Sequence, residues 1–522
     1  MRFKQIICIL LSLTLLLGLT ACGQNEPSTE SKPQTNVQEE VDDSSSDENP
    51  AEDEDISVAN SYTLSEEPLV FISDKEKDFT FIEDAAKIYD KSELDATSGT
   101  IIDINTENQK QEINGFGATI SETSVVAMSQ VPQEEVDKAY IRLFDKEEGI
   151  GLNIIRNTIG ASDFAVDYYT YDDMPEGEED YELAHFDFSR ELEGVVPYTK
   201  KAYEIIGEED YEMILSPWTA PLWMKSEYKW QGKYRATLRR ECYNVYAKYL
   251  VKSIQEWEKQ GIPVDIITPQ NEPWSANNWP GMWWDWESLA NYANDYLRPA
   301  LDDAGLDVKI LNCDNDYKYS EEANNIMSAT MLSTQGVGYH WYSGDPEMMA
   351  ETAELFPDAL IYVTEASSSR PYSLGTLLRR TQSIARCLRT GANAYVLWNL
   401  ALDQEGGPTY DDINTHCAGI ITCDSETGKV SYSHDYYALA HYSKYIHKGA
   451  HVVESTDTGT DTNHELENVV TLNPNGTMTA VITNYYLNED QVCKLVLGDK
   501  VMEVNVPARS VITVTWDANV YE

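Results

Sequence analysis

The chain has 522 residues, of which 89 are acidic and 38 basic, giving a formal net charge of -51 at pH 7. This charge argues against a nucleic-acid partner, because binding to phosphate backbones demands a basic face. It also disfavours electrostatic docking on anionic lipid headgroups.

The first residues have the layout of a secretory signal. Two basic residues precede an apolar run from Ile6 to Leu19, which is too short to span a bilayer comfortably. The run ends Leu19-Thr20-Ala21-Cys22-Gly23, which resembles the lipobox of bacterial lipoproteins. We therefore expect residues 1–21 to be a signal peptide and Cys22 to carry a lipid that anchors an exported protein at the bacterial cell surface. An ordinary signal with a chance cysteine is the alternative.

The following segment, 22–60, has the composition of a linker. From Gly23 to Asn60 there are 12 acidic residues, one lysine and hardly any large apolar side chains. Such a segment cannot bury enough surface to offset its ordering entropy, and its like charges keep it extended. We expect a disordered acidic tether, with a specific binding tail as the alternative.

The next part of the chain alternates between strand and helix patterns. Helical spacing is clearest over Thr237–Gln260, Trp286–Ala304 and Leu374–Thr390. Alternation of this kind is typical of a parallel sheet with helical crossovers, so we predict an α/β fold, a (β/α)₈ TIM barrel over 111–441. Its strands are expected at Ile113–Ala118, Leu152–Thr158, Tyr211–Leu215, Val264–Thr268, Val308–Asn312, Gly336–Trp341, Leu360–Thr364 and Ala394–Leu400.

After Tyr442 the pattern changes to short β-rich runs separated by turns such as Asn473-Pro474-Asn475-Gly476. This change predicts an antiparallel β-sandwich domain over 442–522. The segment 61–110 precedes the barrel, and within it Gly99–Asn105 also has strand character. We expect that strand to cross over and pair with the C-terminal sheet.

Cysteine is too sparse for a disulfide framework in an exported chain of this length. Cys417 and Cys423 are close enough in sequence to bridge a loop, and two free buried thiols are the equal alternative. No Cys/His spacing resembles a metal site, so we expect neither a metal nor a cofactor. Beyond Cys22, the cysteines are Cys242, Cys313, Cys387, Cys417, Cys423 and Cys493.

Two of the expected barrel strands lead directly into a glutamate. Val264–Thr268 is followed by Pro269-Gln270-Asn271-Glu272-Pro273, and Leu360–Thr364 is followed by Glu365. Catalytic groups of TIM barrels come from several strand ends on one face. A retaining glycosidase needs a carboxylic acid to protonate the leaving oxygen and a carboxylate about 5 to 5.5 Å away to attack the anomeric carbon. A lone glutamate is usually a solvated charge, but this pair predicts catalysis.

Polar residues near the same rim would support this chemistry. Asn271 could hydrogen-bond a sugar hydroxyl next to the anomeric carbon, or cap the turn before Pro273. His340 or Tyr342 could donate a hydrogen bond to the nucleophile and keep its pKa low, while burial keeps the acid glutamate protonated. A His-Tyr pair that satisfies loop backbone is the alternative.

Tryptophans also gather at the expected strand ends. Trp218 and Trp398 could offer indole faces to the apolar face of a sugar ring, with core packing as the alternative. The loop after Pro273 either forms a platform for the leaving group or packs partly in the core. Its tryptophans are Trp274, Trp279, Trp283, Trp284 and Trp286.

Several motifs follow one another along the chain. They are Gly115-Phe116-Gly117-Ala118, Ile155-Arg156 with Ser162-Asp163-Phe164, Leu215-Ser216-Pro217-Trp218, Gln270-Asn271-Glu272-Pro273, His340-Trp341-Tyr342, Thr364-Glu365-Ala366, and Trp398-Asn399-Leu400-Ala401-Leu402-Asp403 followed by Gly406-Gly407-Pro408. In this order they resemble the motifs of glycoside hydrolase family 30, the glucosylceramidase or acid β-glucosidase family. The resemblance runs from about Ile101 to the end of the chain.

The resemblance implies a barrel fused to a β-sandwich, with Glu272 as acid/base and Glu365 as nucleophile. It also implies a set of residues that hold the glycone sugar and a set that supports the two carboxylates. The first set is Asp163, Trp218, Asn271 and Trp398, and the second is Arg156, His340 and Tyr342. A carboxylate such as Asp163 can accept hydrogen bonds from two sugar hydroxyls. The Trp-rich loop after Glu272 departs from the glucosylceramidase pattern.

We therefore expect a retaining β-glycosidase that hydrolyses β-glucosidic bonds by double displacement, similar to glucosylceramidase. Its substrate would be a β-linked glucoside or glycolipid. A β-1,6-glucanase, β-xylosidase or β-fucosidase of the same family is the alternative within enzymes. A non-catalytic, sugar-binding surface lipoprotein is the alternative from another class, and the presence of both glutamates argues against it. The sequence leaves the oligomeric state open.

Overall fold

The computed structural model describes residues 67–410, 416–458, 466–485 and 488–520. The predicted signal peptide 1–21, Cys22 and the predicted linker 22–60 lie outside the described residues. Among those that are described, no helix is both long and apolar enough to cross a membrane.

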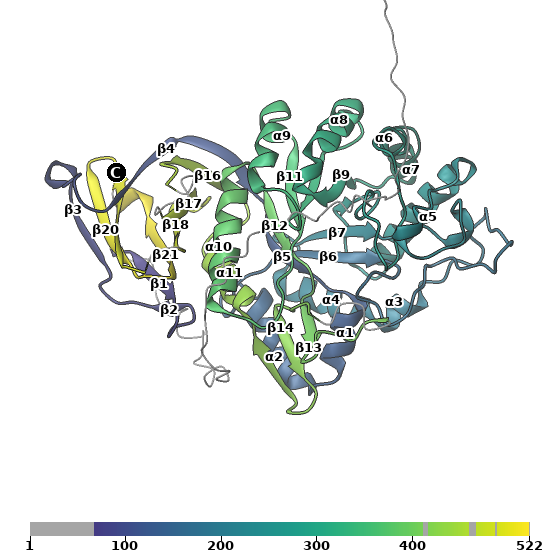
Figure 1. Cartoon of the computed structure of the whole chain (residues 1–522), viewed down its shortest axis with the longest axis horizontal. Coiled ribbons are helices and arrows are strands. Elements are labelled where there is room, and N and C mark those ends of the chain that lie inside the picture. The colour runs from purple at the N-terminus through teal and green to yellow at the C-terminus, as the bar shows by residue number, and fades with distance from the viewer. Residues whose placement is uncertain (1–66, 411–415, 459–465, 486–487, 521–522) are drawn as a thin grey trace, which may run out of the picture. The chain divides into compact units, whose positions relative to one another are not determined.

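Eight parallel strands close into a barrel in the order β10, β11, β12, β5, β6, β7, β8, β9. Figure 1 labels β5, β6, β7, β9, β11 and β12 of this barrel. The predicted (β/α)₈ barrel is confirmed. Its strands are buried almost throughout, as expected for a parallel sheet covered on both faces. They are β5 Gly115–Thr119, β6 Ile154–Ile159, β7 Glu212–Pro217, β8 Ile266–Ile267, β9 Lys309–Asp316, β10 Gly336–His340, β11 Leu360–Glu365 and β12 Ala394–Leu397.

Several helices of this part of the chain are amphipathic. In α10, Leu377, Ile384 and Leu388 recur at helical spacing and are buried, and the hydroxyl of Ser373 caps the first turn. The α-helices are α1 Glu122–Ser129, α2 Gln133–Phe144, α3 Ser189–Glu193, α4 Val195–Ile206, α5 Tyr243–Lys259, α6 Trp286–Tyr292, α7 Arg298–Ala304, α8 Ser320–Thr330, α9 Met349–Leu355, α10 Leu374–Arg389 and α11 His434–Ser443.

The helix predicted over Trp286–Ala304 is interrupted. A wider π turn, Ala293–Leu297, joins α6 to α7. Pro299 lies two residues after this turn and has no N–H for the usual bond to the carbonyl four residues earlier. We attribute the widened turn to that missing donor and to the bulk of the proline ring.

The β domain is one ten-stranded sheet, in the order β2-β1-β21-β18-β17-β16-β4-β19-β20-β3. The run Gly99–Asn105 lies at the start of β4, which pairs with β16 and β19. The β4–β19 pair is parallel, an exception to the antiparallel sheet we predicted. These two strands are far apart in sequence, so no hairpin dictates their direction.

The strands of this sheet are β1 Leu69–Ser73, β2 Thr80–Phe81, β3 Ala86–Asp90, β4 Thr100–Ile113, β16 Ala450–Ser455, β17 Glu467–Leu472, β18 Thr477–Asn484, β19 Gln491–Leu497, β20 Lys500–Val506 and β21 Ser510–Asp517. The structure also contains a separate three-stranded sheet, which the sequence did not predict. Its strands are β13 Ala401–Asp403, β14 Ile421–Asp424 and β15 Lys429–Tyr432.

His441, on α11, links the barrel to the β domain. Its ring is fully buried, with Nδ1 2.8 Å from Thr513 Oγ1 on β21 and Nε2 2.8 Å from Ser73 Oγ on β1. Burial lowers the pKa of His441 to about 3. The folded protein therefore holds this side chain neutral.

This buried histidine predicts a loss of stability in mild acid. Below pH of about 6.5 the unfolded chain takes up a proton on His441, whereas the folded chain does not. Above that pH His441 is neutral in both states and the free energy of unfolding is at its full value. As the pH drops toward the folded pKa, the free energy of unfolding falls, by about 2 kcal/mol between pH 6.5 and 5. Urea unfolding at both pH values should show a smaller pH dependence in His441→Gln than in the wild type. An identical dependence would contradict the prediction.

Candidate active site

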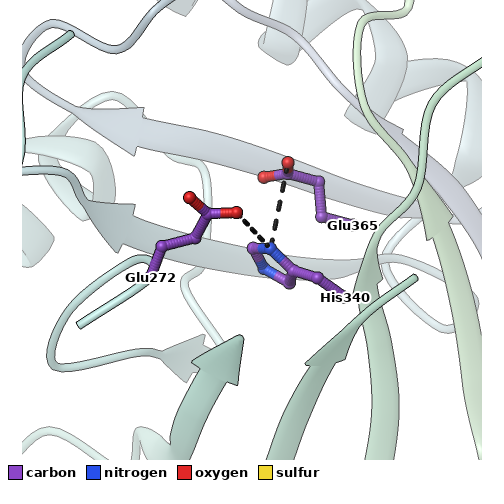
Figure 2. Close-up of side chains that lie close together, drawn as sticks. All are labelled: Glu272, His340 and Glu365. Carbon is purple, nitrogen blue, oxygen red and sulfur yellow. Dashed lines mark hydrogen bonds and ion pairs between the residues drawn. The ribbon is translucent and has the colours of Figure 1, made fainter. Parts of the chain in front are cut away.

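The two predicted glutamates lie together at the carboxyl end of the barrel. Glu365 is the last residue of β11, and Glu272 follows β8. A carboxylate oxygen of each lies within 4.8 Å of the other, and Figure 2 shows both side chains turned toward the ring of His340. The two carboxyl groups are roughly 5 to 5.5 Å apart in retaining glycosidases and roughly 6.5 to 9.5 Å apart in inverting ones, so the close approach of these oxygens favours the retaining arrangement.

The backbone around Glu272 is held in an unusual conformation. Glu272 has φ of 47°, in the left-handed region that costs a residue with a side chain of order 1–3 kcal/mol. Two hydrogen bonds hold this turn, one from Glu272 N–H to the carbonyl of Asp314 at 2.9 Å and one from Asn271 N–H to the carbonyl of Pro217 at 2.8 Å. Through these bonds, strands β7 and β9 fix the direction in which the Glu272 side chain points.

Arg156, on β6, joins the nucleophile side of the site to Asn271. Its buried guanidinium donates to Glu365 Oε2 at 2.6 Å, to Asn271 Oδ1 at 2.7 Å and to Asp314 Oδ2 at 3.1 Å. The planar fork of arginine suits such simultaneous bonds. Because Arg156 occupies the Asn271 oxygen, the Asn271 amide nitrogen is left as the donor for another group.

Asp314, on β9, is a central residue that the sequence prediction missed. Its fully buried carboxylate accepts from Arg156, from Thr268 Oγ1 at 2.7 Å and from Thr364 Oγ1 at 2.7 Å, and lies 3.2 Å from His340 Nε2. Burial raises the pKa of Asp314, but the charges and bonds of Arg156 and His340 outweigh burial and hold it well below its usual value. Asp314 is therefore ionised and orients both cationic groups.

Each glutamate has its own hydrogen-bonding neighbour, His340 for Glu272 and Tyr342 for Glu365. His340 Nδ1 lies 3.3 Å from Glu272 Oε1 and 3.9 Å from Glu365 Oε1, whereas Tyr342 donates to Glu365 Oε1 at 2.8 Å. Of the two donors predicted for Glu365, Tyr342 makes the hydrogen bond. Burial lowers the pKa of His340, but the charge of Glu365 and the bonds to Asp314 and Glu272 outweigh it and raise the pKa to about 10. His340 is thus an imidazolium.

The surroundings of Glu272 differ from those we expected. Burial raises the pKa of its carboxyl, but the hydrogen bond and charge of His340, together with Asn277 and Ser275, lower it below the usual value. Asn277 Nδ2 donates to Glu272 Oε2 at 2.7 Å. The prediction that burial alone keeps this glutamate protonated was therefore wrong, because a buried cation lies beside it.

Trp218 and Trp398 stack on each other, with ring centroids 5.1 Å apart, and are 2% and 3% exposed. They form a buried cluster with Phe164 and Leu402. Asp163 is 9% exposed. Burial and the charges of Glu365 and Glu272 raise its pKa well above the usual value. The structure thus brings Asp163 close to both glutamates.

The Trp-rich loop packs partly in the core, with one tryptophan buried and the other four half-buried. Trp284 is 2% exposed, and Trp274 and Trp286 pack against the main core. Trp279 packs against the Trp218 and Trp398 cluster. The loop is held by Lys225, whose buried ammonium donates to Gly281 O at 2.9 Å, to Thr219 Oγ1 and to Lys229 O.

Glu272, His340 and Glu365 lie close enough to hold a metal ion. However, both nitrogens of His340 face carboxylates, and the raised pKa means that both carry protons. A protonated ring has no lone pair for a metal, so the donor set favours an ion-pair network. The six cysteines from Cys242 onward are all free thiols, Cys417 and Cys423 among them.

Comparisons with known proteins follow the same division of the chain. Residues 113–446 match the glycosyl hydrolase family 30 TIM-barrel domain, and 449–514 match the family 30 β-sandwich domain. The chain is 27% identical over 427 residues to endo-1,6-β-D-glucanase BGN16.3 of Trichoderma harzianum, covering 79% of this chain and 85% of that protein. It is 26% identical over 456 residues to lysosomal acid glucosylceramidase of Mus musculus, covering 80% and 84%. The solved structure of the endo-β-1,6-glucanase BT3312 matches with a TM-score of 0.75 at 25% identity, over 86% of this chain and 99% of that one.

Proposed function

The chain belongs to glycosyl hydrolase family 30, and on this premise we propose that it is a retaining β-glycosidase with Glu365 as nucleophile and Glu272 as acid/base. The observation that carries the proposal is the carboxylate pair, with oxygens within 4.8 Å of each other and each bound by its own donors. Such close spacing favours direct attack of one carboxylate on the anomeric carbon over attack by a water held between that carboxylate and the sugar.

The reaction would proceed in two displacements. First, Glu365 attacks the anomeric carbon and forms a glycosyl ester, the glycosidic bond breaks, and the leaving oxygen takes a proton from Glu272. Next, Glu272 takes a proton from water, the water oxygen attacks the anomeric carbon, and the carboxylate of Glu365 leaves. Arg156 and Tyr342 each donate a hydrogen bond to the nucleophile and hold its carboxyl group in position.

The proton for the first step resides on the His340–Glu272 pair. Across 3.3 Å the Nδ1 proton of the His340 imidazolium can pass to Glu272 Oε1, and Glu272 then gives it to the leaving oxygen. The lowered pKa of Glu272 suits its role as base in the second step. His340 supplies the positive charge and the proton that the acid step requires.

The glycone sugar would lie against Trp218, Trp398, Asp163 and Asn271. The indole N–H of Trp398 is buried and has no hydrogen-bond acceptor among the described residues. Buried donors are nearly always paired, so a substrate hydroxyl is a fitting partner. The amide nitrogen that Arg156 leaves free on Asn271 supplies a second donor.

The substrate class we propose is β-glucosides, with β-1,6-linked glucan as a second candidate. The second candidate is favoured by the similarity of the chain to several endo-1,6-glucanases. A panel of chromogenic β-glucoside, β-xyloside and β-fucoside, together with β-1,6-glucan and glucosylceramide, tests both. We expect β-glucoside cleavage with the β-anomer as first product by NMR. A wild-type protein that cleaves none of the panel, or releases the α-anomer first, would refute the proposal.

For localisation we propose a lipid anchor on Cys22. Each buried methylene of an acyl chain contributes about 0.8 kcal/mol to membrane binding, whereas the acidic body is repelled by anionic lipid. Cys22→Ser should therefore release the protein into the medium or leave it unprocessed, with unchanged specific activity. Cys8→Ser is the matched control and should stay anchored. Cell fractionation decides, and a serine variant at position 22 that is processed and still membrane-bound would contradict the anchor.

A further inference from the structure

Asn277, on the Trp-rich loop, contacts one of the two carboxylate oxygens of Glu272. Its Nδ2 donates to Glu272 Oε2 at 2.7 Å, whereas His340 Nδ1 lies 3.3 Å from Oε1. Figure 2 shows the contact with His340. A donor on each oxygen fixes the rotation of the carboxyl group, and each oxygen keeps a second lone pair for the proton of a reacting group.

The segment that carries Asn277 is paired with a segment of the chain after β7. The backbone N–H of Lys233 donates to the carbonyl of Asn277 at 2.8 Å, and that of Gly281 donates to the carbonyl of Trp230 at 3.0 Å. The two segments approach closely at Gly232, where a Cβ would lie 3.2 Å from the backbone nitrogen of Asn277. The backbone of Asn277 is therefore held by neighbours on both sides of its amide.

Lys225 joins the same two segments. Its ammonium, on a side chain that is 4% exposed, donates to the carbonyl of Lys229 at 2.7 Å and to that of Gly281 at 2.9 Å. Breaking these bonds would leave a buried charge and buried acceptors without partners, which is costly. The fold thus places the Asn277 amide at Glu272 before any substrate binds, and such a preorganised donor needs no rearrangement during the reaction.

We propose that Asn277 is a positioning residue for the second displacement, in which Glu272 takes a proton from water; this rests on the proposed function. A hydrogen bond to an ionised carboxylate is about twice as strong as one to a neutral group. Asn277 therefore favours the ionised form of Glu272, the form that can act as base. In keeping with this role, the side chains of His340, Asn277 and Ser275 together lower the pKa of Glu272.

Asn277 differs from the charged groups around Glu272 because its amide does not titrate. A change in pH dependence on its removal therefore reflects the missing hydrogen bond and not the loss of a second titration. In the glycosyl ester Glu365 carries no charge, which leaves Glu272 as the carboxylate whose ionisation the base step requires. The titratable groups near Glu272 are His340 on β10, Tyr342 after β10, Glu365 on β11, Asp316 on β9 and Asp163 after β6.

The test measures hydrolysis of the glycosyl ester by itself. The wild type and Asn277→Ala are converted to the ester with 2,4-dinitrophenyl 2-deoxy-2-fluoro-β-glucoside and freed of reagent, and the return of activity is followed across pH. We expect the rate of return to fall at low pH, where Glu272 takes up a proton. In Asn277→Ala this fall should lie about one pH unit higher than in the wild type, the scale of one hydrogen bond to a charged group.

Two further variants sharpen the test. Asn277→Asp keeps the size of the side chain but places a second carboxylate beside Glu272, so the fall should move to still higher pH. Asn278→Ala, at the exposed next position of the same loop, is the matched control and should behave as the wild type. If Asn277→Ala does not fold, as judged by circular dichroism, Asn277→Asp gives the same decision.

The outcomes separate this inference from the proposed function. A fall at the wild-type pH in the Asn277 variants would overturn the role of Asn277, whatever their rates. So would an equal shift in Asn278→Ala, because a general loosening of the loop would then explain both. A wild type that forms no glycosyl ester would instead refute the proposed function itself.

Discussion

Glu365→Gln should lower kcat for β-glucoside hydrolysis by about 10⁴-fold or more, the scale seen when one member of a catalytic unit is removed. The amide keeps the size of the side chain but cannot form the glycosyl ester, so the first displacement has no nucleophile. Arg156 also loses the negative partner that its Nη1 binds at 2.6 Å. Steady-state assays with a chromogenic β-glucoside give the rate.

The covalent intermediate provides a second readout for the same variant. Wild-type protein quenched in acid during turnover should carry one glycosyl unit by mass spectrometry, and Glu365→Gln should carry none. Glu351→Gln, at an exposed position on α9, is the matched control and should behave as the wild type. Retention of most of the activity in Glu365→Gln would remove Glu365 from the mechanism.

Glu272→Ala should lower kcat by about 10² to 10⁴-fold on substrates with poor leaving groups, the usual contribution of a general acid or base. Substrates with good leaving groups need little protonation, so the glycosyl ester still forms and its hydrolysis becomes limiting. Added azide should then attack the ester, restore turnover and yield a β-glycosyl azide. If no such azide forms, Glu272 is not the acid/base.

The barrel could be predicted because each of its strands is a short apolar run between helical segments, a local pattern. The end of β9 could not be predicted from such a pattern, because it is polar. Asn312, Asp314 and Asp316 form a polar run typical of a loop, yet the run is buried and strand-paired because Arg156 and His340 on other strands neutralise it. A signal was present, since both predicted glutamates also follow an apolar run at a strand end.

The sequence predicted which residues belong to the site, but not which of them contact one another. Glu272, Glu365 and Arg156 stand in motifs, and the structure brings them together. That His340 lies nearer to Glu272 than to Glu365 depends on how strands close around the barrel, which no local pattern encodes. The same long-range contact gives Glu272 a lowered pKa where burial alone would raise it. Asn277 was missed for a similar reason, because its loop is set by contacts to Gly232 and Lys233.

The strand pairing of the β domain has a consequence for the order in which the chain folds. β1 pairs with β21, and β4 lies between β16 and β19, so the earliest strands along the chain need the last ones as neighbours. The barrel between them is built from contiguous chain and can assemble first, whereas pairings so distant in sequence form slowly. During synthesis β1 and β4 remain unpaired edges, which are prone to associate with other chains. If synthesis stops before Ser510, β21 is missing, and β1, near the other end of the polypeptide, lacks this partner strand.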